Sequence, residues 1–374
     1  MTLSWDDLLQ ALRDPQAMVN YDPDTWDLVV RQAAGAGVLG RLASLARDAG
    51  VLARLPLPVK RRMGASQTIA EQQVRAVHWE LVKLSETLAE LKGPIVLLKG
   101  AAYAASGLAP AAGRLFSDID LLVPKDQLAA TEAALMLGGW NSSHHDHYDQ
   151  RYYRQWMHEL PPMMHIKRRT VLDLHHNILP ETARIRTRPD LIIAAATPLG
   201  SFPRFSIPDP ADQVLHSATH LFHEGEWAHG LRDLADLDAL LRDYGRDPAF
   251  WDRLVDRSAS LHLGKPLFYG LRYARALLHT PFPADLLDRC PGRPGRVGAW
   301  IMDALFPAAF ATAHHTCRTR RSGFATWCLY VRSHWLRMPM RLLLPHLIRK
   351  SWKRRIVPWL AAEPEQPGDD PLLP

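Results

Sequence analysis

Two aspartates separated by one residue, Asp118 and Asp120, are the residues of this 374-residue chain whose types and spacing point most directly to chemistry. Alternate residues of a β-strand point to the same side, so both carboxylates would project together while Ile119 faces the core. Two like charges at the end of a strand repel each other unless a cation lies between them. We therefore expect the pair to bind a divalent cation, and a magnesium ion that carries a phosphate is the simplest choice.

Two further features of the sequence belong to the same prediction. A short apolar strand before the pair ends in Lys99-Gly100, where Gly100 would permit a turn and a helix beginning at Ala101 would direct its N–H groups at phosphate oxygens. A later stretch, 171–178, alternates so that one face carries Asp173. The sequence thus predicts a site of three carboxylates on strands.

The elements around these strands predict an α+β fold, a small mixed β-sheet flanked by N-terminal and C-terminal helical regions. Apolar spacing of three to four residues indicates a long helix over about 59–91 and helices from 210 to about 313. We also expect strands near 152–160 and 163–167. The predicted regions are an N-terminal helical region (1–92), a catalytic core (93–205), a helical region that completes a nucleotide pocket (206–315), a basic aromatic helical segment (316–360) and a disordered tail (361–374).

Composition excludes several classes of protein. A hydrophobic content of 47% with 22% charged residues is that of a globular chain. The first residues lack the basic start and apolar run of a secretory signal, and no stretch approaches the roughly 18 to 20 apolar residues that span a bilayer. Three cysteines without a CxxC pair indicate neither a disulfide framework nor a zinc knuckle. We expect a cytoplasmic protein.

The basic character of the chain is local. Residues 318–360 contain eleven Lys and Arg and no Asp or Glu, so the rest of the chain is net acidic. Four tryptophans, from Trp327 to Trp359, lie among these cations. Such a segment suits a nucleic-acid backbone or the surface of an anionic membrane, which would place the protein peripherally at the membrane, or it is a helical subdomain with a solvated basic face.

The combination of LLKGAA, a following arginine, SDIDLLV and LDLHHNI resembles the bacterial uncharacterised nucleotidyltransferase family of the DNA-polymerase-β-like nucleotidyltransferase superfamily. The likeness covers roughly residues 60–245. It implies that Gly100 lies at a phosphate-binding turn and that Asp118, Asp120 and Asp173 hold two Mg²⁺ or Mn²⁺ ions. Asp173 would also help to take a proton from the acceptor.

The function that this resemblance implies is the transfer of an NMP from an NTP to an acceptor hydroxyl or similar nucleophile, by two-metal in-line displacement. The acceptor, whether a small molecule, a peptide or RNA, and the oligomeric state stay open. The superfamily's usual Gly-Ser or Gly-Gly pair is Gly100-Ala101 here, so the serine hydroxyl that would contact a phosphate is absent. The alternative is a non-catalytic protein with a degenerate fold that binds a nucleotide or a partner.

Several candidate residues leave two interpretations open. Lys99 binds a triphosphate or forms an ion pair with the aspartates, and Arg114 binds phosphate or packs against them. His175 faces the metal or is structural. The other phosphate-binding candidates are Ala101 and Ser117, and the helical half adds Arg232, Asp233 and Asp236 as residues of the nucleotide pocket.

Histidines at two other places invite a metal interpretation. The tract His144-His145-Asp146-His147 lies in a polar stretch without fixed geometry, so a solvated loop is the favoured interpretation. The second group, His216, His220 and His223, has helical spacing but lacks the glutamate of an HExxH motif, which favours helix packing over zinc binding.

Overall fold

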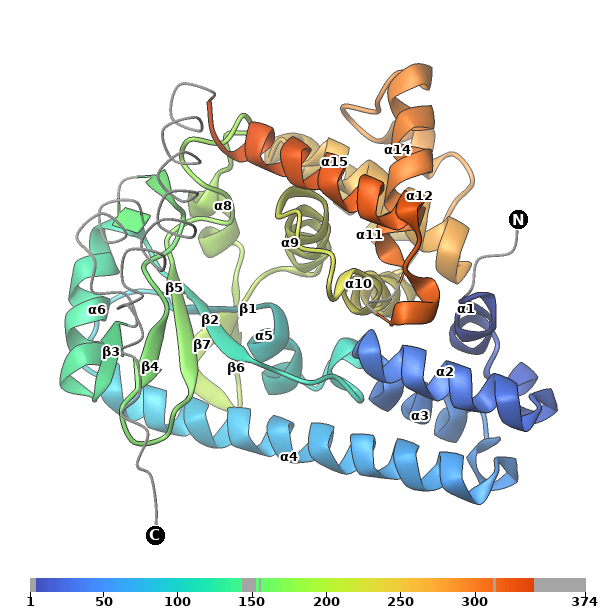
Figure 1. Cartoon of the computed structure of the whole chain (residues 1–374). Helices are drawn as coiled ribbons and strands as arrows, with labels where there is room; N and C mark the ends of the chain where they lie inside the picture. The colour runs from blue at the N-terminus through green and yellow to red at the C-terminus, as the bar shows by residue number, and fades with distance from the viewer. Residues whose placement is uncertain (1–4, 143–152, 155, 312–313, 340–374) are drawn as a thin grey trace, which may run out of the picture.

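A computed structural model describes residues 5–142, 153–154, 156–311 and 314–339, and all statements about the structure refer to these residues. The tract 144–147 and the predicted tail 361–374 lie outside them. The fold is α+β, as the sequence predicts, with one mixed sheet between two sets of helices (Figure 1).

The sheet has seven strands in the order β3-β4-β5-β2-β1-β7-β6. Strand β2 lies at its centre, antiparallel to β1 and parallel to β5. Strand β1 in turn is parallel to β7, and the other neighbouring pairs are antiparallel. The strands are β1 (Val96–Leu98), β2 (Asp118–Leu122), β3 (Trp140–Ser142), β4 (Met163–His165), β5 (Val171–His175), β6 (Thr197–Leu199) and β7 (Phe202–Ile207).

Along the chain, helices lie before the first strand, between strands and after the last strand. The N-terminal helices are α1 (Asp6–Arg13), α2 (Pro23–Gly35), α3 (Leu39–Asp48) and α4 (Leu57–Thr87). Helices α5 (Lys99–Ser106), α6 (Leu128–Leu137) and α8 (Pro189–Ala194) lie between strands. The C-terminal helices are α9 (Pro210–His223), α10 (Gly230–Tyr244), α11 (Ala249–Ser260), α12 (Gly264–Leu278), α13 (Leu286–Arg289), α14 (Arg296–Phe310) and α15 (Arg320–Arg337).

The long helix predicted from apolar spacing is confirmed as α4. It buries one stripe of side chains, among them Met63, Ala70, Val77 and Leu84. Figure 1 shows α4 running along one side of the molecule, beneath both the N-terminal helices and the sheet. This one helix therefore links the N-terminal region to the strands that carry the aspartates.

The strand predicted near 152–160 is wrong. Residues 153, 154 and 156 are helical, and Glu159 forms only an isolated antiparallel bridge with His175. Leu160 is the buried apolar residue among those described in this stretch, and β4 already pairs with the edge of β5 that a further strand would need. The strands predicted near 163–167 and in 171–178 are confirmed as β4 and β5, which pair antiparallel.

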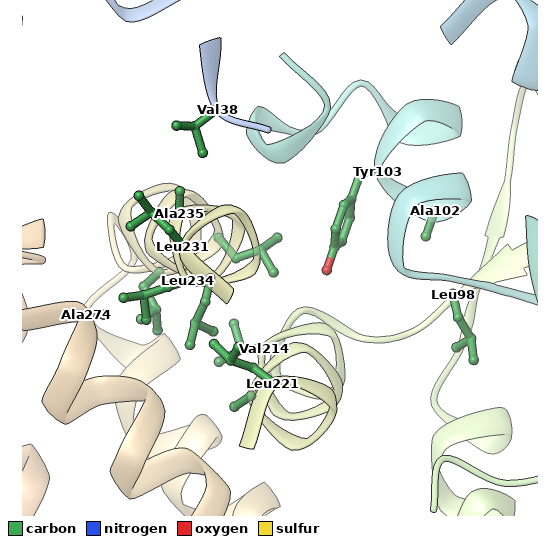
Figure 2. Packing of buried hydrophobic residues seen from close by; sticks show 14 of the residues in the cluster. Val38, Leu98, Ala102, Tyr103, Val214, Leu221, Leu231, Leu234, Ala235 and Ala274 are labelled. Atoms are coloured by element: carbon green, nitrogen blue, oxygen red, sulfur yellow. The ribbon is translucent and has the colours of Figure 1, made fainter. Parts of the chain in front are cut away.

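Helices α5, α9 and α10 pack around a common apolar core close to the sheet. Figure 2 shows Tyr103 of α5 pointing toward α9, with Val214 and Leu221 on α9 and Leu234 on α10. All four side chains are buried. This packing brings α9 and α10 beside the ends of β1 and β2, where the candidate residues lie. Among the described residues, no helix is long and apolar enough to cross a membrane.

Candidate functional site

The candidate site is centred on two neighbouring parallel strands. In the register of β2 and β5, Asp120 lies directly opposite Asp173, and Asp118 precedes Asp120 by two residues on the same face. Asp120, Asp173 and His175 each offer a ligand atom, and these atoms all lie within 4.8 Å of one another. Asp118 is not part of that closest group. The structure thus brings the predicted carboxylates to one face, with His175 beside them.

The three aspartates differ in their electrostatic surroundings. Burial, followed by the charges of Asp120 and Glu159, raises the pKa of Asp173 to about 7. Burial and then Asp120 also raise the pKa of Asp118. Burial alone would raise the pKa of Asp120 too, but Lys99 and a hydrogen bond from His175 outweigh it and lower that pKa. Asp120 is therefore the carboxylate that the protein itself neutralises.

Lys99 is an ion-pair partner of the aspartates, one of the two interpretations that the sequence left open. Its Nζ lies 3.5 Å from Asp120 Oδ1. Burial alone would lower the pKa of Lys99, but Asp120 and Glu224 outweigh it and raise the pKa. The side chain also lines the pocket beside Asp118, so it faces any anion that enters there.

The turn after β1 differs from its prediction. Helix α5 begins at Lys99 rather than Ala101, and the residue with a positive φ, of 44°, is Lys99 rather than Gly100. Gly100 is required for another reason, because a Cβ there would lie 2.7 Å from Cδ1 of Phe116. Ala101 is fully buried within α5. Gly100 thus allows Phe116, which lies just before β2, to pack closely against the start of α5.

A pocket opens beside Asp118 and Asp120. It combines side chains from the turn after β1, the segment before β2, and helices α9 and α10, so elements distant in the sequence share it. The predicted residues Lys99, Arg114, Ser117, Arg232, Asp233 and Asp236 line it together with the two aspartates; Tyr103, Ser217 and His220 complete the lining.

Asp236 is buried and forms two ion pairs. It forms ion pairs with Arg114 and with Arg41, whose guanidinium lies 3.0 Å from Asp236 Oδ1. Arg41 also donates a hydrogen bond of 2.7 Å to the Pro110 carbonyl. Since Arg41 belongs to α3, this cluster joins the N-terminal helices to the pocket. Arg114 therefore packs against the carboxylate of Asp236 rather than against Asp118 or Asp120.

Three residues near the aspartates were missed by the sequence analysis. Glu159 contacts His175, whose Nδ1 lies 3.3 Å from Glu159 Oε2, while His175 Nε2 lies 3.0 Å from Asp120 Oδ1. His158 is buried next to His175, with ring centroids 5.4 Å apart. Glu224, which is partly buried, contributes a negative charge to the same surroundings. In the sequence, His158 and Glu159 stand together before an apolar stretch. Neither this pair nor Glu224 belongs to a helical or strand periodicity that would mark it as part of the site.

The histidines of α9 do not gather around a common point. His220 pairs with Glu224 one turn later, with 2.7 Å between Nε2 and Oε2, while His216 and His223 are buried in packing. Burial lowers the pKa values of His216 and His223, which keeps both rings neutral. In the part of the chain that the structure describes, no group of potential metal ligands includes them. Helix packing, the favoured interpretation, agrees with this arrangement.

The fold is thus an α+β fold in which two central strands present acidic side chains beside a pocket that both basic and acidic side chains line. A family model described as "Uncharacterised nucleotidyltransferase" matches residues 22–279, more than half of the chain, and the chain belongs to this family. The match extends beyond the predicted 60–245 on both sides and includes helices α2 to α4 and α11. A comparison with curated proteins finds no match.

Proposed function

We propose that the chain is a magnesium-dependent nucleotidyltransferase that moves a nucleoside monophosphate from an NTP to an acceptor hydroxyl or similar nucleophile. The observation that carries this proposal is the pairing of Asp120 with Asp173 across β2 and β5, beside a pocket that Lys99 and Arg232 line. Nucleotidyl transfer spreads negative charge over the attacking, leaving and equatorial oxygens. A site with carboxylates for cations and basic side chains for phosphates suits that charge distribution.

The carboxylates fit a divalent cation. Asp173 Oδ1 is buried and has no hydrogen-bond partner among the described residues, which is costly for a charged oxygen unless a cation meets it. Carboxylate oxygens are the ligands that Mg²⁺ and Mn²⁺ prefer. Asp118, Asp120 and Asp173 would hold the ions. When bound, such ions stabilise charge on the phosphoryl oxygens and lower the pKa of an acceptor hydroxyl.

The protein's own side chains divide the remaining work. Asp173, which lies opposite Asp120, would help to take the acceptor's proton. Lys99 and Arg232 face the pocket as cations and would orient the phosphates. Ala101 has no hydroxyl, so we assign hydrogen bonding to phosphate to Ser117 and Ser217, which both line the pocket.

The proposal is tested with the purified chain, Mg²⁺ and NTPs labelled at the α-phosphate, offered with small alcohols, peptides and RNA as separate acceptor classes. We expect label to reach one class of acceptor and to stay with the donor in the variant Asp118→Asn/Asp120→Asn. Asp190→Asn, on an exposed residue of α8, is the matched control. Transfer that persists in the double variant would overturn the proposal.

A second candidate function is nucleotide or partner binding without transfer. Two observations favour it: Ala101 is buried and offers no hydroxyl, and Lys99 already pairs with Asp120 where a cation would bind. Calorimetry separates the two functions. NTP binding that is indifferent to Mg²⁺ and to Asp173→Asn supports a binding protein, whereas binding that requires both supports the enzyme.

A further inference from the structure

A second cluster of ligand-type side chains lies behind Asp120. His158, Glu159 and His175 each offer one ligand atom, and the three atoms lie within 4.8 Å of one another. Oε2 of Glu159 is 3.3 Å from His175 Nδ1 and 3.8 Å from His158 Nε2. Both rings are more than nine-tenths buried, at 6% and 2% exposure. The Nδ1 atoms of both histidines have no hydrogen-bond partner among the described residues.

The two nitrogens of His175 have different surroundings. Nε2 lies 3.0 Å from Asp120 Oδ1 and can donate its proton there. A histidine that binds a metal usually donates its other N–H to a carboxylate in this manner. Nδ1 then presents a lone pair to the carboxylate of Glu159, and this contact lacks the geometry of a hydrogen bond. A lone pair and a carboxylate repel each other unless a cation lies between them.

That cation is either a proton or a metal ion. A proton on His175 Nδ1 would serve His175 alone, since His158 presents Nε2 to the same Glu159 oxygen at 3.8 Å, beyond hydrogen-bonding distance. A metal ion would meet a lone pair of each ring. Two lone pairs and one carboxylate are the donors of a metal site.

The spacing and the surrounding charge also fit a metal. Ligand atoms about 2.1 Å from a tetrahedral ion lie about 3.4 Å apart, close to the observed 3.3 and 3.8 Å. The charged groups that face the cluster from neighbouring elements are Asp120, Glu224, Lys99 and Arg337. Together with Glu159 they include three carboxylates and two cations, so the surroundings attract an additional positive charge.

We propose that His158, Glu159 and His175 bind a divalent transition-metal ion of the zinc class, separate from the site of the three aspartates. Two imidazoles and one carboxylate suit Zn²⁺ or Co²⁺, whereas Mg²⁺ prefers oxygen ligands. The ion would add a side-chain link to the backbone hydrogen bonds that already join residues 158–160 to β5 and to the residues directly after it. It would also hold His175 Nε2 against Asp120, which makes His175 a positioning residue for the aspartates.

The test uses the full chain, stripped of metal with a chelator and titrated with Co²⁺, whose visible d–d absorption reports nitrogen and oxygen ligands without any assay of activity. We expect about one Co²⁺ per chain, displaced by Zn²⁺, with affinity reduced at least about tenfold in His158→Gln and Glu159→Gln. His176→Gln, next to His175 and buried beside Glu181, is the matched control and should bind Co²⁺ as the unmodified chain does.

Two outcomes would overturn the metal site. Absence of the Co²⁺ spectrum in the unmodified chain would show that His158, Glu159 and His175 hold no metal ion. A spectrum that survives His158→Gln but disappears in Asp173→Asn would place the ion at the aspartates instead. Neither outcome bears on nucleotidyl transfer, which is measured separately with Mg²⁺ and labelled NTP.

A different observation concerns α14 and α15, which pack against each other. Helix α15 buries Ala325 and Leu329 on its inner face, yet Phe324 and Trp327 on the outer face are each 62% exposed, and Val331 is 48% exposed. Phe324, Trp327 and Val331 have the spacing i, i+3 and i+7, so they lie on one face of the helix. On α14, exposed apolar side chains again follow one face: Val297, Trp300 and Ile301.

The charge around this apolar face is positive. Arg318, Arg320 and Arg321 are exposed at the start of α15, and residues 318–360 contain no acidic side chain. Aromatic and aliphatic side chains beside a cluster of arginines suit the interface of an anionic membrane. A nucleic acid would favour cations interleaved with each aromatic ring, but the stripe from Phe324 to Val331 contains none.

From this geometry we infer that α14 and α15 dock on an anionic membrane surface. The full chain is sedimented with vesicles of phosphatidylcholine containing phosphatidylserine, and with vesicles of phosphatidylcholine alone. We expect binding to the anionic vesicles that falls at least about fivefold in Phe324→Ser/Trp327→Ser and is unchanged in Leu137→Ser, an exposed apolar control on α6. Equal binding by both variants, or binding to RNA but not to vesicles, would overturn the inference.

Discussion

Asp120 and Asp173 lie side by side in register on the parallel strands β2 and β5, although they are far apart in the sequence. Residues opposite each other on neighbouring strands share one face, so the buried carboxylate of Asp120 and the partly buried carboxylate of Asp173 repel each other. Lys99 and His175 stabilise the charge of Asp120, whereas the pKa of Asp173 rises to about 7. The pair therefore offers one carboxylate that the protein neutralises and one that it leaves for a cation.

This relationship predicts how metal affinity depends on Asp173. Replacing Asp173 with Asn removes a ligand oxygen that has no hydrogen-bond partner among the described residues, so Mn²⁺ binding measured by calorimetry should weaken at least about tenfold. The control is Asp126→Asn, an acidic residue exposed after β2. Unchanged Mn²⁺ affinity in Asp173→Asn would show that the carboxylate of Asp173 is not a ligand.

The contact between Gly100 and Phe116 predicts a steric effect. A methyl group at Gly100 would lie 2.7 Å from the Phe116 ring, so Gly100→Ala should destabilise the protein by about 1–3 kcal/mol in urea unfolding. Phe116→Leu should recover part of that loss in the double variant. Gly64→Ala, in the exposed middle of α4 where no atom lies within 4 Å of the added Cβ, should instead stabilise by about 0.5–1 kcal/mol. Additive effects at Gly100 and Phe116 would contradict the contact.

The buried cluster of Arg41, Arg114 and Asp236 predicts a large effect on stability. Asp236→Asn removes the carboxylate between two buried guanidinium groups and should lower the free energy of unfolding by about 3–5 kcal/mol. Asp243→Asn, on the same helix but paired with the exposed Arg246, should change it by less than about 1 kcal/mol. Similar losses in both variants would argue that Asp236 does not hold the N-terminal helices to the pocket.

His223 predicts a dependence of stability on pH. Burial, and then the charges of Arg332 and Arg337, lower its pKa to about 3 from an ordinary 6.5. Between these values the unfolded chain binds a proton that the folded chain does not. The stability due to neutral His223 is thus fully present above about pH 6.5 and is lost as the pH falls toward 3, by at most about 1.4 kcal/mol per pH unit.

Unfolding by urea across this pH range measures the effect. His223→Gln should flatten the dependence of the unfolding free energy on pH, because the glutamine side chain does not titrate. The exposed His315→Gln is the control and should leave the slope as it is. An unchanged slope in His223→Gln would mean that His223 titrates alike in the folded and unfolded chains.

Much of the fold could be predicted from local patterns. The three-to-four-residue spacing of α4 and the alternation of β2 and β5 are properties of neighbouring residues, which depend little on the rest of the molecule. Alternation also placed Asp118 with Asp120, and Asp173 with His175, on shared faces. The same reasoning misjudged 152–160, where residues 153, 154 and 156 are helical, and it placed the turn at Gly100 rather than Lys99.

The types of residue, their faces and the family resemblance were thus determined by the sequence alone, since covalent spacing and secondary-structure periods fix them. Only the tertiary structure decided which residues meet. The register of β2 with β5 set Asp120 against Asp173, and the path of the chain before β4 placed Glu159 against His175. Packing of α3 and α10 likewise joined Arg41 to Asp236. A period reveals the face on which a side chain lies, whereas its partner on another element depends on how the elements pack.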